Sequence, residues 1–236
     1  MTPVMSGILM TLVIKYVKCD RKSEECRMRV SKEQAAHNRE EILTSAARLF
    51  REHGIDATGV DSITGDAGLT HGGLYSQFGS KQAIVTEAIR FALAESRGAW
   101  RRAAQGKPAK KAFSDIVTTY LSRRHRDSPG KGCLVAALSG DIARQPAAVR
   151  GAFTAELKEV LELMATLMPG DRPARRRADA TAALACMEGA LILARAVNDE
   201  TLSEGILKAA ADRVCRMAAI RAPVRSGSRT SVGARR

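Results

Sequence analysis

Strand signals are nearly absent from this 236-residue sequence, and aromatic residues make up only 4% of it. Ala-rich and Leu-rich segments instead repeat with the period of a helix, separated by glycine and proline. The sequence therefore predicts an all-α protein. Its length is sufficient for a small head and a larger helical domain, with ample material for a core.

Motifs of enzymes are also missing. The sequence has no nucleophile elbow, no Walker loop, no HExxH motif and no dinucleotide fingerprint. Its acidic pairs, Glu24 with Glu25 and Glu40 with Glu41, are adjacent and would diverge on a helix instead of converging on a substrate. We therefore nominate no catalytic residue and expect no cofactor, and we interpret the chain as a non-enzyme.

Cysteine is sparse and odd in number, and the sequence has neither a CxxC pair nor a histidine at metal-ligand spacing. This usage is typical of a reduced cytoplasm and predicts no disulfide framework and no metal site. Cys133 follows a glycine-containing loop, so either a reactive thiol or a packed small hydrophobic residue fits it. Cys186 and Cys215 lie within apolar helical faces and are predicted to be core.

A long hydrophobic run is missing as well. The longest apolar run near the start, residues 4–14, is shorter than the ~20 residues that a membrane-spanning helix needs. It also lacks the basic segment and cleavage site of a secretory signal. We therefore predict a cytoplasmic protein with no membrane span.

The segment from Val60 to Lys81 has the pattern of a helix-turn-helix. Val60, Ile63 and Ala67 recur on one helical face, and Gly68 follows as a residue that ends a helix at little cost. Thr70 stands at the N-cap of the next helix. This arrangement predicts a helix that packs, a tight turn and a second helix free to enter a major groove.

The second helix has an apolar pair and a set of outward positions. Leu74 and Phe78 are four residues apart and would hold this helix on its neighbours. The candidate DNA contacts occupy the other faces and the following helix start: Thr70, His71, Gly73, Tyr75, Gln77 and Lys81. Lys81 lies in the first turn of a helix that Ser80 can cap, a position that suits a phosphate group.

A supporting helix precedes the motif. Its apolar residues have helical spacing and are Ile42, Leu43, Ala46, Ala47, Leu49 and Phe50. Together with Thr58-Gly59-Val60, Ala67-Gly68-Leu69 and Gly73-Leu74-Tyr75, this pattern resembles the TetR family of bacterial repressors over about residues 35–95.

The resemblance implies roles for the candidate residues. It implies that Tyr75 and Lys81 contact the operator backbone, and that Thr70, His71, Gly73 and Gln77 lie at or near the DNA. Thr64, Gly65 and Gln77 depart from the usual family pattern. Glycine inside a helix costs about 0.8 to 1 kcal/mol relative to alanine, so the helix that contains Gly65 depends on packing.

The formal charge of the chain is +13, but the head does not carry this excess. Residues 31–81 contain five basic and seven acidic residues, a net charge of −2, whereas residues 221–236 contain five arginines and no acid. The prediction of a double-stranded DNA partner therefore rests on the motif. The basic ends either add salt-sensitive, non-specific affinity or are merely solvated.

The resemblance also implies a small-molecule effector pocket in the C-terminal domain. Its predicted lining consists of the large or adaptable apolar side chains Trp100, Phe113, Tyr120, Phe153, Met164 and Met187. Tyr120, His125 and Glu188 are the predicted polar anchors. The alternative for the apolar residues is ordinary core, and for His125 it is a solvated loop.

A homodimer interface is predicted on the last two helices, where small residues allow close helix approach. The predicted interface residues are Ala183, Met187, Gly189, Ala190, Ala194, Ile206, Val214 and Met217. The alternative is that this face covers the core of its own domain.

The predicted organisation has four parts. Residues 1–30 are a disordered extension or a misassigned start before Met28, 31–80 a helix-turn-helix domain, 81–221 an effector-binding and dimerisation domain, and 222–236 a disordered basic tail. The predicted function is a dimeric repressor that binds a pseudo-palindromic operator and is released by an effector. A redox-sensing regulator that uses Cys133 and a transcriptional activator are the alternatives.

Overall fold

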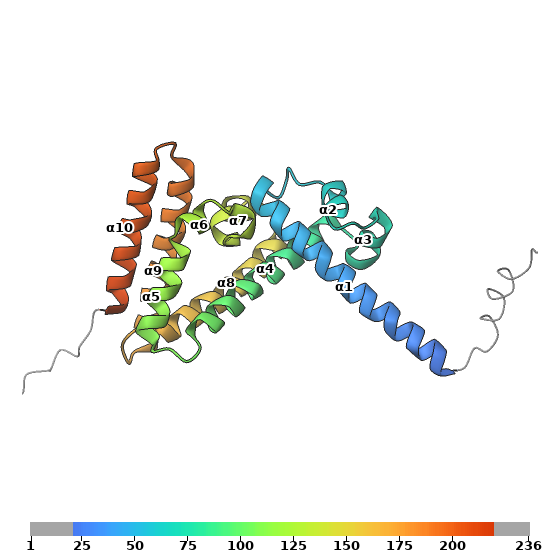
Figure 1. Cartoon of the computed structure of the whole chain (residues 1–236), viewed down its shortest axis with the longest axis horizontal. Helices are drawn as coiled ribbons and strands as arrows, with labels where there is room; N and C mark the ends of the chain where they lie inside the picture. Colours follow the sequence, from blue (N-terminus) through green and yellow to red (C-terminus); the bar gives the residue numbers. More distant parts are fainter. Residues whose placement is uncertain (1–20, 220–236) are drawn as a thin grey trace, which may run out of the picture. The chain divides into compact units, whose positions relative to one another are not determined.

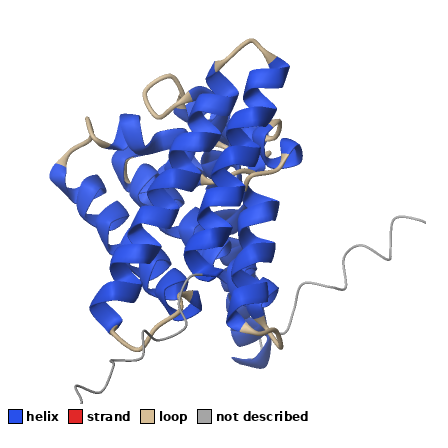
Figure 2. Ribbon diagram, turned by 90° about the vertical axis from the view of Figure 1, so that its left-hand side faces the viewer, coloured by secondary structure: helices blue, strands red, loops and turns tan. Residues whose placement is uncertain are grey.

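The computed structural model describes residues 21–219, and helices joined by short loops account for this range (Figures 1 and 2). No strand occurs among these residues, which confirms the all-α prediction. The elements follow in this order: α1 (Arg21–His53), α2 (Val60–Asp66), α3 (His71–Phe78), α4 (Lys81–Ala104), α5 (Ala109–Tyr120), α6 (Arg123–Arg126), η1 (Pro129–Lys131), α7 (Leu134–Ile142), α8 (Ala147–Leu167), α9 (Pro173–Ala196) and α10 (Glu200–Ala219).

The chain divides into two compact units, one ending at Glu41 and one beginning at Ile42. In the first unit, α1 is helical from Arg21, although a disordered extension or a misassigned start was expected through residue 30. The expected basic tail, 222–236, and residues 1–20 lie outside the described residues.

The second unit begins with the head, whose helices form where the apolar spacing predicts them. The six apolar residues expected on the supporting helix are all buried in α1. Gly54 follows α1 with φ of +86°, and Gly68 makes the turn between α2 and α3 with φ of +65°. Both conformations favour glycine. Ile63 of α2 and Leu74 of α3 are fully buried, so the two short helices are held by packing.

The helical body follows the head without a break in the core. α4 begins at Lys81 in the head and packs along α8, while α9 packs against α8 and α10, and α5 packs against α10 (Figure 1). One hydrophobic cluster connects Ile63 of the head with Phe113 and Val214 of the body. The boundary expected at residues 80 and 81 therefore lies inside one compact unit.

None of the helices within residues 21–219 combines the length and the apolar character that crossing a membrane requires.

Candidate DNA-binding surface and ligand cavity

Helix α3 starts and stops by local hydrogen bonding. Thr70 is its N-cap, and Thr70 Oγ1 accepts a hydrogen bond from the backbone N–H of Gly73 at 3.3 Å. Leu74 and Phe78 are buried against the rest of the head. Gly79, with φ of +73°, ends the helix. The capped and packed α3 therefore has a fixed orientation on the head.

The exposed face of α3 contains His71 and Tyr75. Tyr75 is 45% exposed, and its ring lies edge-on to that of His71 with 6.0 Å between centroids. His71 Nε2 also contacts the carboxylate of Asp61 of α2. Gly72 and Ser76 are exposed as well. They lie four residues apart, as His71 and Tyr75 do, and this helical spacing could have identified them from the sequence.

The remaining predicted DNA residues are less exposed. Gly73 and Gln77 are half-buried on α3, and Lys81 is half-buried in the first turn of α4. Ser80 caps α4, because its Oγ accepts from the N–H of Ala83 at 3.1 Å. Lys81 Nζ donates to the carbonyl of Asp56 at 3.3 Å. An ammonium group has three donors, so this bond leaves Lys81 two donors for a phosphate.

Asp66, at the end of α2, connects the helix-turn-helix motif to α1 by hydrogen bonds. Its carboxylate accepts hydrogen bonds from Arg48 and from the hydroxyl of Ser45. These two bonds hold the pKa of the Asp66 carboxyl below its ordinary value. The first helix of the motif is therefore attached to α1 by charge-assisted bonds as well as by its apolar face.

The base of the head is hydrogen-bonded to the body at several points. The N–H of Ile55 donates to Asp141 Oδ2 of α7 at 3.0 Å. Arg51 Nε of α1 donates to the carbonyl of Gly130 in η1 at 2.8 Å. Burial lowers the pKa of the Arg51 guanidinium from its ordinary value. Residues 128–133 are thus in direct contact with the head.

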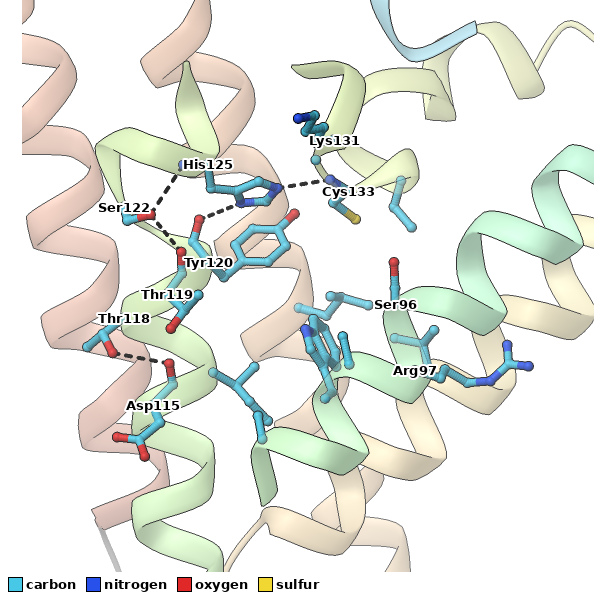
Figure 3. A pocket seen from close by; sticks show the side chains of 18 of the residues that line it. Ser96, Arg97, Asp115, Thr118, Thr119, Tyr120, Ser122, His125, Lys131 and Cys133 are labelled. Atoms are coloured by element: carbon cyan, nitrogen blue, oxygen red, sulfur yellow. Dashed lines mark hydrogen bonds between the residues drawn. The ribbon is translucent and has the colours of Figure 1, made fainter. Parts of the chain in front are cut away.

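A cavity of about 790 Å³ lies in the body, between α4, α5, α8, α9 and the segment 122–133. Its apolar lining includes Leu93, Trp100, Ile116, Val160 and Leu184. This volume is in the range of small-molecule sites. Figure 3 shows polar side chains from α5 and from the following segment at one end of the cavity.

At this end, His125 connects two backbone segments. His125 Nδ1 lies 2.6 Å from the carbonyl oxygen of Tyr120, and His125 Nε2 accepts from the N–H of Cys133 at 2.9 Å (Figure 3). A carbonyl only accepts, so the proton is on Nδ1 and the ring is neutral. Burial lowers the pKa of His125 below 6.5, in agreement with this neutral form.

Cys133, Tyr120 and Glu188 meet at the same end. Cys133 Sγ donates to Glu188 Oε1 at 3.2 Å. Burial raises the pKa of the Cys133 thiol to about 12, and it also raises the pKa values of Glu188 and Tyr120. A thiol with so high a pKa holds almost no thiolate at neutral pH, so the redox-sensing alternative is not favoured by this environment.

The structure distributes the predicted pocket residues over two environments. Trp100 and Tyr120 line the cavity, as do the predicted anchors His125 and Glu188. Four predicted residues do not line it: Phe113, Met164 and Met187, which are buried in the core, and Phe153, which is half-buried on α8. The sequence could not separate core from lining, because both faces repeat with the same helical period.

The structure places the predicted dimer residues in two environments. Five of its residues are buried within this chain and are unavailable to a partner: Ala183, Met187, Ala190, Ala194 and Val214. Gly189, Ile206 and Met217 are half-buried. The large apolar side chains that α9 and α10 expose are instead Ile192, Leu193 and Leu202. In the sequence, Ile192 and Leu193 lie within two positions of the predicted residues Ala190 and Ala194, and Leu202 lies four positions before Ile206.

Within residues 21–219, no group of three or more His, Cys, Asp or Glu side chains could hold a metal ion.

Fold and site together define a regulatory protein with a helix-turn-helix head. Residues 42–88 match the family model described as bacterial regulatory proteins, tetR family. The matches support a TetR-family transcriptional regulator, and the regulators of this family are non-enzymatic DNA-binding proteins.

Two curated relatives show how far the sequence similarity extends. The HTH-type transcriptional repressor KstR2 of Rhodococcus jostii is 39% identical over 82 residues, 34% of this chain and 40% of that protein. The chain thus spans less than half of KstR2. The uncharacterized HTH-type transcriptional regulator Rv0196 of Mycobacterium tuberculosis is 27% identical over 171 residues, 69% of this chain and 87% of that protein.

Solved structures support the fold. Reduced NemR of Escherichia coli superimposes with a TM-score of 0.66 at 19% identity, covering 80% of this chain and 99% of NemR. SCO4454, a TetR-family regulator of Streptomyces coelicolor, gives 0.63 at 23% identity, covering 78% and 97%. At these identities the similarity concerns the fold alone.

Proposed function

We propose that this protein is a transcriptional repressor that binds a pseudo-palindromic operator as a homodimer and is released by a small molecule. The observation that carries the proposal is the single helix α4. Lys81 in its first turn is one of the candidate DNA contacts, while Leu93 and Trp100, further along the same helix, line the cavity. A ligand that displaces the cavity end of α4 would therefore also displace the head.

The DNA-binding part of the proposal rests on α3. Its exposed face presents His71, Gly72, Tyr75 and Ser76, and the buried Leu74 and Phe78 hold the helix in place. A capped helix with one exposed polar face is suited to a major groove. The similarity to repressors named KstR2 favours repression over activation, and a DNA partner implies a cytoplasmic location.

The dimer would form through the exposed stripe of α9 and α10. On α9 this stripe contains Ala182, Ala185, Gly189, Ile192, Leu193 and Ala196, which recur at spacings of three and four. Leu202 extends it onto α10, and its large side chains are 45–57% exposed. Two copies of this helix pair would bury the stripe in a four-helix interface. The two heads would then read half-sites about 34 to 36 Å apart.

The segment 128–133 supports a second route of release. Lys131, Gly132 and Cys133 line the cavity, and Gly130 between them and α6 accepts the hydrogen bond from Arg51 of α1. A ligand that shifts this segment would act on the head directly. The ligand weakens operator binding only by the difference between the ligand's own binding free energies for the two conformations of the protein, typically about 1 to 3 kcal/mol.

The test is binding of the purified chain to fluorescent duplexes from the regions that flank its gene, with salt varied and competitor DNA present. Saturable binding to one duplex is expected. Tyr75→Ala should weaken this binding more than Tyr75→Phe does, since the phenylalanine keeps the ring contact and loses only the hydroxyl. Equal, salt-sensitive binding of every duplex, unaffected by Tyr75→Ala, would contradict operator recognition by α3.

A further inference from the structure

The cavity has a polar end with two incomplete hydrogen-bonding groups. Tyr120 Oη and Glu188 Oε2 form no hydrogen bond of normal geometry, although both residues are more than nine-tenths buried and their side chains are close enough to interact with each other. Figure 3 shows the Tyr120 hydroxyl directed to the side of the cavity where Cys133 lies. Buried polar groups are rarely left without a partner, so this pair is suited to a polar group of a ligand.

The rest of the lining restricts the body of that ligand. Leu93, Ile116, Val135, Val160 and Leu184 supply apolar side chains, and Trp100 lies edge-on to Tyr120 with 6.3 Å between ring centroids. Such a lining favours a compact hydrocarbon body. The ligand thus needs one polar group at the Tyr120 end and apolar surface elsewhere.

The two incomplete groups differ in what they require. Glu188 Oε2 is an acceptor and needs a donor, whereas the phenol of Tyr120 can donate its proton. A hydroxyl group satisfies both, because its hydrogen can go to Glu188 and its oxygen can accept from Tyr120. A carboxylate would face the carboxyl of Glu188 and offers it no proton.

An amine is opposed by the cations around the cavity. The cationic residues that line it are Arg97, Lys107, Arg124 and Lys131, and Arg195 also acts electrostatically on Glu188. Asp115, through its ion pair with Lys107 at 2.8 Å, and Glu156, through its ion pair with Arg97, partly offset these charges. An ammonium group would be repelled by these cations, whereas an uncharged hydroxyl group would not be.

We propose that the effector is an uncharged apolar alcohol whose hydroxyl lies between Tyr120 and Glu188. This inference rests on the proposed function, since it names the ligand class of the same cavity. It is tested without DNA, so its outcome is separate from that of operator binding.

Trp100 provides the measurement, because it is the only tryptophan in the sequence and lines the cavity. The purified full chain is titrated with four probes that share one bicyclic body: decahydro-2-naphthol, decahydro-2-naphthylamine, decahydro-2-naphthoate and decalin. The probes do not absorb where tryptophan is excited. The alcohol is expected to bind at least about tenfold more tightly than each of the other three.

Two variants assign this preference to the polar end. Tyr120→Phe removes only the hydroxyl. It is expected to weaken binding of the alcohol about tenfold and to leave the affinity for decalin unchanged. Glu188→Met replaces the carboxyl with an apolar group of similar length and should have the same effect. Thr154→Ala, which removes a hydroxyl from an exposed residue of α8 outside the lining, is the control and should change neither affinity.

The proposal is overturned if none of the four probes binds or if all four bind equally. It is also overturned if the preference for the alcohol survives both Tyr120→Phe and Glu188→Met. If one variant does not fold, the other still decides the result. A chain that prefers the alcohol but binds no operator would retain this inference and lose the proposed function.

Discussion

Arg51 of the head donates its Nε–H to the carbonyl of Gly130 at 2.8 Å, and Gly130 belongs to the segment whose next three residues line the ligand cavity. The bond connects residues 79 positions apart in the sequence. Because a guanidinium is always charged, this is a charge-assisted bond in a partly buried place. It gives the head a direct attachment to the cavity wall.

Removing this attachment should destabilise the protein. Arg51→Met keeps the apolar stem but loses the donor, and we expect a loss of about 1.5 to 3 kcal/mol in the free energy of unfolding. Urea denaturation followed by circular dichroism measures it. Arg90→Met, at an exposed residue of α4 that pairs with nearby Glu87, should cost less than about 1 kcal/mol. Equal effects of the two variants would argue against a special role of the Arg51 bond.

Gly72 should matter for DNA and not for folding. A Cβ at Gly72 would meet no atom within 4 Å, so Gly72→Ala should leave folding intact and stabilise α3 by up to about 1 kcal/mol. The added methyl group would, however, project from the exposed face and weaken operator binding. The matched control is Gly65→Ala in α2, where a Cβ also meets nothing. Fluorescence anisotropy with the operator should show a loss only for Gly72→Ala.

A charge in the exposed stripe should break the dimer. Leu193 is 57% exposed on α9, and Leu193→Glu would place a carboxylate in an interface that excludes water. Light scattering is expected to give the mass of a dimer for the unmodified chain and of a monomer for the variant. Thr154→Glu, at an exposed site of α8, should leave the mass unchanged. A dimer that persists with Leu193→Glu would place the interface elsewhere.

Stability should fall in mild acid because of His125. Its pKa is below 6.5 in the folded chain, so below pH 6.5 the unfolded chain binds the proton more readily. The free energy of unfolding is expected to decrease as the pH falls through and below this value. Protonation also removes the acceptor for the N–H of Cys133. His125→Gln should flatten this part of the pH profile, whereas His53→Gln, at an exposed site, should not.

Cys133 should react slowly. With a thiol pKa of about 12, iodoacetamide at neutral pH should modify Cys133 at least tenfold more slowly in the folded chain than in urea. Mass spectrometry of the peptide that contains Cys133 measures both rates. Peroxide should likewise leave operator binding unchanged, and Cys133→Ser should behave in the same way. Rapid modification of the folded chain would restore the redox-sensing alternative.

The pattern of apolar residues and caps was enough to predict the head. Ile63, Leu74 and Phe78 are buried as their spacing indicated, Gly68 has the positive φ of a turn, and Ser80 caps α4. These features depend on residues close together in the sequence. Helical period and local hydrogen bonds decide them, and both can be read from a single chain.

The body shows where such a pattern stops being sufficient. Met187 and Ala194 have the helical spacing that interface residues would also have, yet both are buried within this chain. Leu193, next to Ala194, faces outwards instead. Which side of α9 meets α8 and α10 depends on how the helices are oriented about their axes, and a period of 3.6 residues does not contain that orientation.

The sequence by itself determined the all-helical class, the helix-turn-helix and its capping residues, because neighbouring residues carry those preferences. Only the tertiary structure decided the cavity and the exposed stripe. Tyr120, Cys133 and Glu188 come from three separate stretches of the chain, and the packing of α5, α7 and α9 brings them to one end of the cavity. The pKa values, the incomplete hydrogen bonds and the attachment of Arg51 to Gly130 all follow from that packing, because each depends on which distant groups share a buried space.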